Sequence, residues 1–195
     1  MVTLKQLIAK LDAMLSARHT EKQWQQLFLD NPFVLSLAFG LPIVSIGDQM
    51  SVGGRRLDGT GDKIVDFLHR NALTDNVSLV EIKTPGSKLL GTEYRNGVYG
   101  PSAELTGAIT QVLDQRYQLQ RSIAVIKDTS RRSDIESYAI KCMIIIGTTP
   151  ATPEAKKSLE LFRNSLNDVL IVTFDELLTK LKHLLEFISP VGQSD

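Results

Sequence analysis

The pattern of apolar and polar positions along the chain changes from helical to strand-like after about forty residues. Apolar residues at helical spacing follow Thr3, and they follow Thr20 again, where a capping box marks a second helix start. Short apolar runs bounded by glycines and polar turns then predict strands over 43–52, 63–69 and 77–83. The short polar turn between the last two strands predicts an antiparallel hairpin.

The second half of the chain is predicted to alternate helices with strands after a long loop. Residues 84–101 hold four glycines and two prolines, and a loop of that length inside a compact domain is usually functional. The pattern assigns no element to residues 121–141. The remaining predicted elements are helix 102–117, strand 143–147, helix 153–165, strand 169–174 and helix 175–188. This order predicts an α/β fold in which helices flank a mixed central sheet.

Length and composition are consistent with one globular domain. The 195 residues are 43% hydrophobic, which is enough to bury a sizeable core, and no repeat or linker divides them. We therefore expect a single domain over 1–195, with an N-terminal helix over 1–19, a core over 20–188 and a tail over 189–195.

Charge, cysteine and histidine usage exclude several classes of protein. Twenty-two basic residues balance twenty-two acidic ones, which excludes a polybasic nucleic-acid binder but not a locally basic cleft. The single cysteine, Cys142, lies in an apolar run and cannot form an internal disulfide, so a reducing cytoplasm is expected. The three histidines lack the spacing of a zinc site. No signal peptide or stretch of membrane-spanning length is visible, so we expect a cytoplasmic protein with no membrane partner.

Three charged residues lie in the apolar strands 63–69 and 77–83. Glu81 and Lys83 are two residues apart on one strand, so their side chains leave the same face of the sheet. In the predicted hairpin, Asp66 comes level with Glu81. Charges inside a sheet are costly unless they are paired, hydrated or bound to a metal.

Two carboxylates beside a lysine suit a hard divalent cation. Asp66, Glu81 and the backbone carbonyl of Ile82 are candidate ligands for Mg²⁺, with Mn²⁺ as a substitute, and leave room for water and a phosphate. Lys83 is then expected to orient or deprotonate that water, because a desolvated lysine can have a lowered pKa. The alternative interpretation is an internal ion pair of Lys83 with Asp66 or Glu81 that only holds the sheet.

Two further polar residues favour the metal-site interpretation. Glu21 opens the second helix, although pairing with the helix dipole explains it equally well. Gln111 lies in the apolar stripe of helix 102–117 and needs hydrogen-bond partners, which a water or a core carbonyl would also provide.

The succession Glu21 on a helix, Asp66 and Glu81-x-Lys83 on strands, and Gln111 on a later helix resembles the PD-(D/E)XK restriction-like nuclease superfamily. A closer resemblance is to the nuclease domain of Shedu antiphage-defence proteins. Its motifs here are Glu21 to Gln25, Asn31-Pro32, Val52 to Gly54, Asp66, Val80 to Pro85 and Ser102 to Gln111.

The resemblance implies a restriction-endonuclease-like αβββαβ core and a metal-dependent DNA endonuclease acting in antiphage or mobile-element defence. Asp66 and Glu81 match the metal ligands of the family, and Lys83 matches its catalytic lysine. Glu21 matches the acidic residue of the first core helix, and Gln111 matches the later helix glutamine. One departure is that valine stands immediately before Asp66, where the superfamily's name has proline.

Four basic residues near these motifs are candidate phosphate contacts: Arg55, Arg56, Lys88 and Arg95. Tyr94 and Tyr99 are candidates for stacking on bases or for pinning the loop. The expected partners are therefore DNA, further copies of this chain in a homo-oligomer, and a separate regulatory protein, since Shedu proteins usually carry an additional N-terminal regulatory region. The alternatives are a nucleic-acid-binding or regulatory module that works in an oligomer, and a restriction or repair nuclease.

Overall fold

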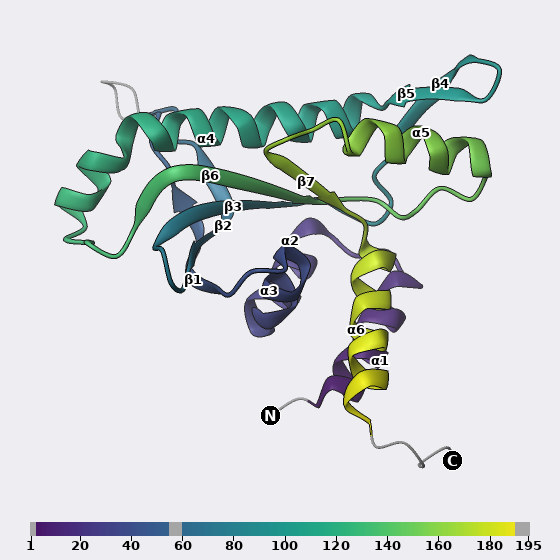
Figure 1. Cartoon of the computed structure of the whole chain (residues 1–195), viewed down its shortest axis with the longest axis horizontal. Helices are drawn as coiled ribbons and strands as arrows, with labels where there is room; N and C mark the ends of the chain where they lie inside the picture. The colour runs from purple at the N-terminus through teal and green to yellow at the C-terminus, as the bar shows by residue number, and fades with distance from the viewer. Residues whose placement is uncertain (1–2, 55–59, 190–195) are drawn as a thin grey trace.

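A mixed five-stranded sheet forms the centre of the protein (Figure 1). The computed structural model describes residues 3–54 and 60–189. The strands lie in the order β1 (Ile43–Ser51), β2 (Ile64–Asn71), β3 (Asn76–Ile82), β6 (Glu136–Ile145) and β7 (Val169–Val172). The pairs β1–β2 and β2–β3 are antiparallel, whereas β3–β6 and β6–β7 are parallel. The predicted α/β class, the mixed sheet and the hairpin between the second and third strands are confirmed.

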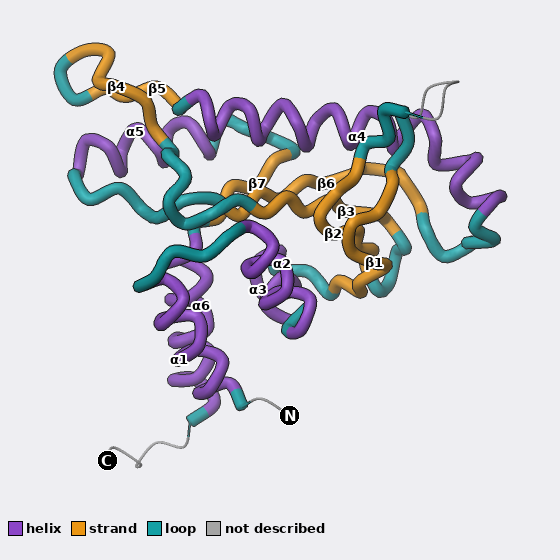
Figure 2. Tube along the Cα trace, turned by 180° about the vertical axis from the view of Figure 1, so that it is seen from behind, coloured by secondary structure: helices purple, strands orange, loops and turns teal. Residues whose placement is uncertain are grey.

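Helices cover both faces of the sheet (Figures 1 and 2). One layer holds α4 (Ala103–Thr129) and α5 (Pro153–Arg163), and the other holds α1 (Leu4–Leu15), α2 (Glu21–Asp30), α3 (Phe33–Phe39) and α6 (Phe174–Ile188). Because side chains alternate along a strand, β3 contributes to two separate cores. Leu79 packs with Val112 of α4 and its neighbours, whereas Val80 packs with Trp24, Phe174 and their neighbours. Burial on both faces explains why β3 reads as an almost continuous apolar run.

The helix starts follow the capping chemistry of the sequence. Thr20 accepts a hydrogen bond from Gln23 N, and the Gln23 side chain accepts from Thr20 N, so the predicted capping box is confirmed. Ser102 Oγ accepts from Leu105 N and donates to the carbonyl of Lys88. This second cap ties the start of α4 to the segment that follows β3.

Three segments differ from the prediction. Residues 33–39 form the short helix α3, which ends at Gly40 in a left-handed conformation with φ of 68°. The loop predicted over 84–101 contains a hairpin, β4 (Leu90–Arg95) and β5 (Val98–Pro101), and its glycines had obscured the strand pattern. Residues 121–141, to which the pattern assigns no element, comprise the last turns of α4, a connection over 130–135 and the first part of β6.

None of the helices in the described part of the chain combines the length and apolar character needed to traverse a lipid bilayer.

Gly107 interrupts the longest helix without a structural reason. A Cβ atom built at this position meets no atom within 4 Å. Because glycine in a helix interior costs about 1 kcal/mol relative to alanine, Gly107→Ala is expected to raise the free energy of unfolding by about that amount. Urea denaturation followed by circular dichroism measures the change.

Gly97→Ala is the matched control for this substitution. Gly97 has φ of 76°, and a Cβ there lies 2.9 Å from Cγ of Glu154. We expect this alanine to destabilise the protein by about 1–2 kcal/mol, since a left-handed backbone disfavours a side chain. Equal effects of the two substitutions would contradict this account.

Candidate active site

The carboxylate of Asp66 lies where strands β2 and β3 part. The paired register of β2 and β3 ends with Phe67 opposite Val80, and Asp66 and Glu81 are the next residues on the two strands. Beyond this point the N–H of Ile82 donates to Asp66 Oδ2, at 2.7 Å, rather than to a backbone carbonyl of β2. The side chain of Asp66 therefore replaces a backbone carbonyl of β2 as the acceptor for the next N–H of β3.

Asp66 accepts two more hydrogen bonds from separate elements. Gln25 Nε2 on α2 and Gln49 Nε2 on β1 both donate to Asp66 Oδ1, at 2.8 and 3.0 Å. The residue is only 9% exposed. Desolvation raises the pKa of Asp66 above its ordinary value, although its three donors and the charge of Lys83 act in the opposite direction.

Glu81 is held by three side chains on the other side of this opening. Its Oε1 accepts from Lys83 Nζ at 2.8 Å and from Gln111 Nε2 at 2.6 Å, and its Oε2 accepts from Gln115 Nε2 at 3.2 Å. Only 2% of the residue is exposed. Desolvation, followed by the charge of Asp66, raises the pKa of Glu81 above its ordinary value. Since each carboxylate affects the other, the two groups form one electrostatic unit.

The pKa of Lys83 is shifted in the opposite direction from the prediction. Burial lowers its pKa, but the bond to Glu81 and the charges of Glu81, Glu21 and Asp66 outweigh burial and raise the pKa above its ordinary value. The neighbouring carboxylates therefore favour the protonated ammonium of Lys83, in contrast to the lowered pKa expected beside a metal ion. Such a group donates hydrogen bonds and orients a ligand, but it does not accept a proton.

Three of the five predicted catalytic residues, Glu81, Lys83 and Gln111, are in direct contact, whereas Asp66 and Glu21 act on them through their charges. Lys83 Nζ also donates to Gln111 Oε1, at 3.2 Å, which links α4 to the strand residues. Glu21, at the first turn of α2, acts on Lys83 through its charge. Glu81 and Lys83 are in contact on one face of β3, and Asp66 is linked to both of them through its charge.

Comparison with known proteins places this arrangement in a family. The sequence matches the family described as Shedu protein SduA, C-terminal, over residues 18–178. The chain belongs to the Shedu family. A curated relative, Shedu protein SduA of Bacillus cereus (strain B4264), is 35% identical over 192 residues, which are 95% of this chain and 50% of that protein. The chain thus spans about half the length of this relative. The Shedu resemblance is confirmed, while membership of the PD-(D/E)XK superfamily stays a prediction.

Three glutamines of this Shedu chain complete the site and were not predicted. Gln115 lies one helical turn after Gln111, donates to Ile64 O at 2.8 Å as well as to Glu81, and leaves its own buried Oε1 without a partner. The four-residue spacing from Gln111 could have revealed it, and the same spacing relates Gln25 to Glu21. Gln49 gave no sequence signal, because its contact with Asp66 depends on the fold, in which Gln49 has an unusual φ of 48° for a strand residue.

The donor set fits a cation that prefers oxygen and keeps several waters. Among residues 3–54 and 60–189, no three or more His, Cys, Asp or Glu side chains gather as a metal cluster. Mg²⁺ is commonly bound by one or two carboxylates together with water, and Asp66 and Glu81 are oxygen donors of this kind, whereas a structural zinc requires nitrogen or sulfur ligands that the site lacks among the described residues. The carbonyl and the N–H of Ile82 point to the same side of β3, toward Asp66. The residue is fully buried. Its role as a ligand stays a prediction.

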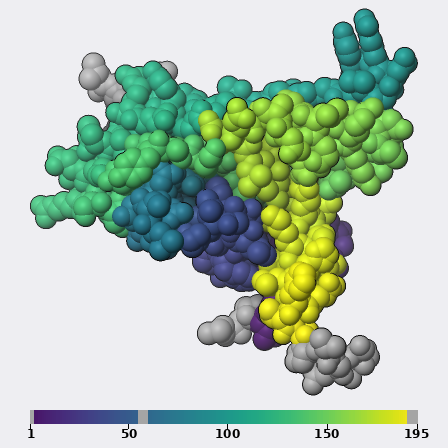
Figure 3. All heavy atoms as spheres, viewed as in Figure 1, coloured from purple at the N-terminus to yellow at the C-terminus, as the bar shows by residue number. Residues whose placement is uncertain are grey.

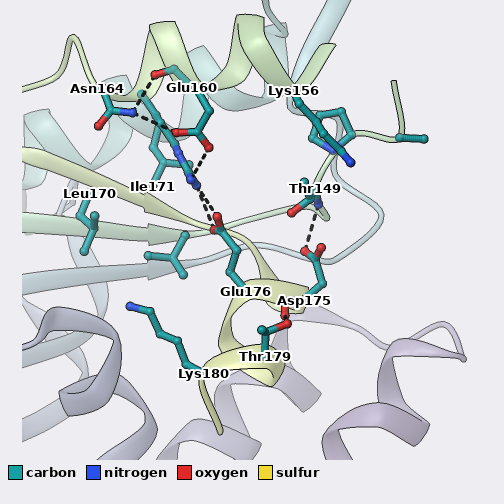
Figure 4. Close-up of a pocket in the computed structure, with 14 residues that line it drawn as sticks. Thr149, Lys156, Glu160, Asn164, Leu170, Ile171, Asp175, Glu176, Thr179 and Lys180 are labelled. Carbon is teal, nitrogen blue, oxygen red and sulfur yellow. Dashed lines mark hydrogen bonds and ion pairs between the residues drawn. The ribbon is translucent and has the colours of Figure 1, made fainter. Parts of the chain in front are cut away.

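An open cleft of about 950 Å³ lies beside the glutamines of this Shedu site, but Asp66, Glu81 and Lys83 are not among the described residues that line it. Gln111 and Gln115 line it together with other residues of α4 and the start of β2, among them Lys63 and Asp114, which form an ion pair at 2.9 Å. A second cavity, of about 710 Å³, lies between α5, β7 and α6 (Figure 4). There Arg163 pairs with Glu160 and Glu176, and no predicted site residue lines the cavity.

The predicted phosphate contacts lie in two regions. Arg55 and Arg56 fall outside the described residues. Lys88 precedes β4 and its N–H donates to Glu104 Oε2, at 3.1 Å. Arg95 lies in β4, exposed, with its guanidinium over the ring of Tyr94. Contact of these residues with DNA stays a prediction.

Proposed function

We propose that this chain is a divalent-metal-dependent endonuclease that hydrolyses phosphodiester bonds in DNA as part of a Shedu-type defence protein. The observation that carries the proposal is the convergence of Asp66, Glu81 and Lys83 at the opening between β2 and β3. A purely structural ion pair requires one acid and one base. Here a second buried carboxylate raises the pKa of the first, which is an arrangement typical of catalytic centres.

Each side chain has a distinct role in this proposal. Asp66 and Glu81, with the carbonyl of Ile82, are the groups that would hold Mg²⁺ or Mn²⁺. The cation, when bound, supplies charge neutralisation at the phosphate and acidifies a water. Lys83, kept protonated and held by Gln111 and Glu81, donates to the water or to a phosphate oxygen. Gln115 fixes the second oxygen of Glu81, and the Gln25 and Gln49 amides fix Asp66.

The reaction adds water across one phosphorus–oxygen bond. The oxygen of the water forms the new bond to phosphorus, the bond to the leaving sugar oxygen breaks, and a proton passes to that oxygen. Since Lys83 is an ammonium, it stabilises the negative charge that develops during this exchange. Lys83 and Gln111 are the two more exposed members of the network, so they form the entrance through which a phosphate reaches the carboxylates.

The test is a metal titration with defined nucleic acids. Purified protein is incubated with supercoiled plasmid, linear duplex, single-stranded DNA and RNA, with Mg²⁺ or Mn²⁺ from zero to 10 mM (an order of magnitude chosen for weakly held hard cations). We expect nicks or breaks in DNA that depend on the metal and stop when a chelator is added. Binding of DNA with no cleavage at any metal concentration would instead support the regulatory module.

A further inference from the structure

The β4–β5 hairpin projects away from the main sheet (Figures 1 and 2). Its strands pair with each other and form a separate two-stranded sheet. It follows the segment after Lys83 and leads into α4, which carries Gln111. In the space-filling view it forms a prominence at one corner of the molecule (Figure 3). The hairpin is thus connected at both ends to elements that carry the candidate active site.

The hairpin is braced against α5. Tyr99 N donates to Ser158 Oγ at 3.1 Å, and Gly97 packs against the side chain of Glu154. The turn has positive φ at Asn96 and Gly97, of 34° and 76°, as a tight hairpin turn requires. An isolated two-stranded hairpin is marginally stable in water. These contacts therefore give the prominence a fixed direction.

Two exposed side chains of the hairpin, Tyr94 and Arg95, contact each other and form no ion pair with the rest of the described chain. Tyr94 is 74% exposed, and Arg95 places its guanidinium 5.4 Å from the centre of the Tyr94 ring. Glu93 accepts from Gly97 N and is thereby turned toward the turn. No described carboxylate forms an ion pair with Arg95 or Lys88. The segment from 84 to 101 thus presents an aromatic ring and two unpaired cations.

We propose that the β4–β5 hairpin is an arm that enters the major groove of duplex DNA bound at the active site. A two-stranded ribbon fits this groove, which is about 12 Å wide. Arg95 then contacts a phosphate and Tyr94 packs against the wall of the groove. This inference rests on the proposed function, since it assigns to the arm the same duplex that the carboxylates would cleave.

Simple lengths set the reach of the arm. Eight residues separate Gln111 from Ala103 along α4, a rise of about 12 Å. Six residues of β4 add about 20 Å. With Ser102 between the two elements, the tip therefore lies at most about 35 Å from the site, close to one turn of B-DNA, which is about 34 Å. The arm is expected to contact the duplex within about one turn of the cleaved bond.

The chain offers a matched control for the arm. On α4, Arg121 lies over the ring of Tyr117, also 5.4 Å from its centre, and Tyr117 is 53% exposed. The experiment measures affinity for a 30-base-pair duplex (about three turns) in chelator, as a function of salt. It compares the wild-type chain, the Tyr94→Ala/Arg95→Ala variant and the Tyr117→Ala/Arg121→Ala variant.

We expect the arm variant to bind the duplex about tenfold more weakly, with a salt dependence reduced by about one ion. The α4 variant should stay within about twofold of the wild type, because it removes the same pair of groups outside the arm. On a duplex of about eight base pairs, shorter than the reach of the arm, wild type and arm variant should bind alike.

The outcomes separate the two proposals. If the wild type neither binds nor cuts duplex DNA, both the proposed function and the proposed role of the arm are disproved. If the wild type binds and cuts, but both double variants bind equally, only the arm is disproved. An equal loss on single-stranded DNA, or a change in oligomeric mass by light scattering, would also overturn insertion in the groove.

Discussion

Lys83→Met is expected to lower metal-dependent DNA cleavage roughly 1,000-fold, the size of effect seen when one preorganised donor is removed from a developing charge. Methionine keeps most of the side-chain stem but removes the ammonium that donates to Glu81 at 2.8 Å and to Gln111 at 3.2 Å. Charge at the phosphate then develops without the side-chain cation that donates hydrogen bonds to it. Initial rates of plasmid nicking at saturating Mg²⁺ measure the effect.

The control for this substitution is Lys156→Met. Lys156 is an exposed lysine that lines the second cavity, away from the carboxylates. Its replacement should leave the nicking rate within about twofold of wild type, since exposed charges far from a site contribute little. Circular dichroism verifies that both variants are folded. A folded Lys83→Met variant that nicks DNA at the wild-type rate would refute the assignment of Lys83.

Acidification is expected to weaken the fold through His69. This histidine on β2 is 1% exposed, and neither of its ring nitrogens has a hydrogen-bond partner among residues 3–54 and 60–189. Burial lowers the pKa of His69 to about 4, from an ordinary value of 6.5. Between pH 6.5 and about 4 the unfolded chain binds a proton that the folded chain rejects, so stability falls with pH across this window. The loss attributable to His69 amounts to about 3 kcal/mol at its lower end.

The measurement compares urea unfolding of wild type and His69→Leu at intervals from pH 7 to pH 4. The stability difference between the two should change by about 3 kcal/mol over this range, in favour of the variant at low pH. Asp66 and Glu81 contribute a term of opposite sign, because their pKa values are raised, but this term is common to both proteins and cancels. His183→Leu, on the exposed side of α6, controls for a general effect of losing a histidine. A parallel pH dependence of wild type and His69→Leu would contradict the prediction.

The central charges of the site were predictable because local rules determine them. Alternation along a strand puts Glu81 and Lys83 on one face, and the short turn between two apolar runs brings Asp66 level with Glu81. Gln111 was predictable for a similar reason, since an amide in an apolar helical stripe needs partners. Each of these inferences involves neighbouring positions or a single hairpin.

The supporting glutamines depend on contacts that no local pattern contains. Gln25 and Gln49 come from α2 and β1, and both reach Asp66 only because the tertiary fold brings the three elements together. The raised pKa of Lys83 was not predicted for a related reason. Burial alone would lower this pKa, but the charges of three carboxylates from different elements raise it. The β4–β5 hairpin was not predicted, because the glycines of this segment interrupt the strand pattern. Asn96-Gly97 is nevertheless a strong signal for a hairpin turn.

Both edge strands of the central sheet have features that disfavour pairing with a strand of another chain. β7 has only four residues, and Arg163 and Glu176 from the two adjoining helices form an ion pair beside it. β1, at the opposite margin, has an irregular register between Ser45 and Gly47. Short, irregular or charge-flanked margins are how natural sheets avoid stacking into aggregates. Further copies of this chain are therefore not expected to add strands at either margin of the sheet.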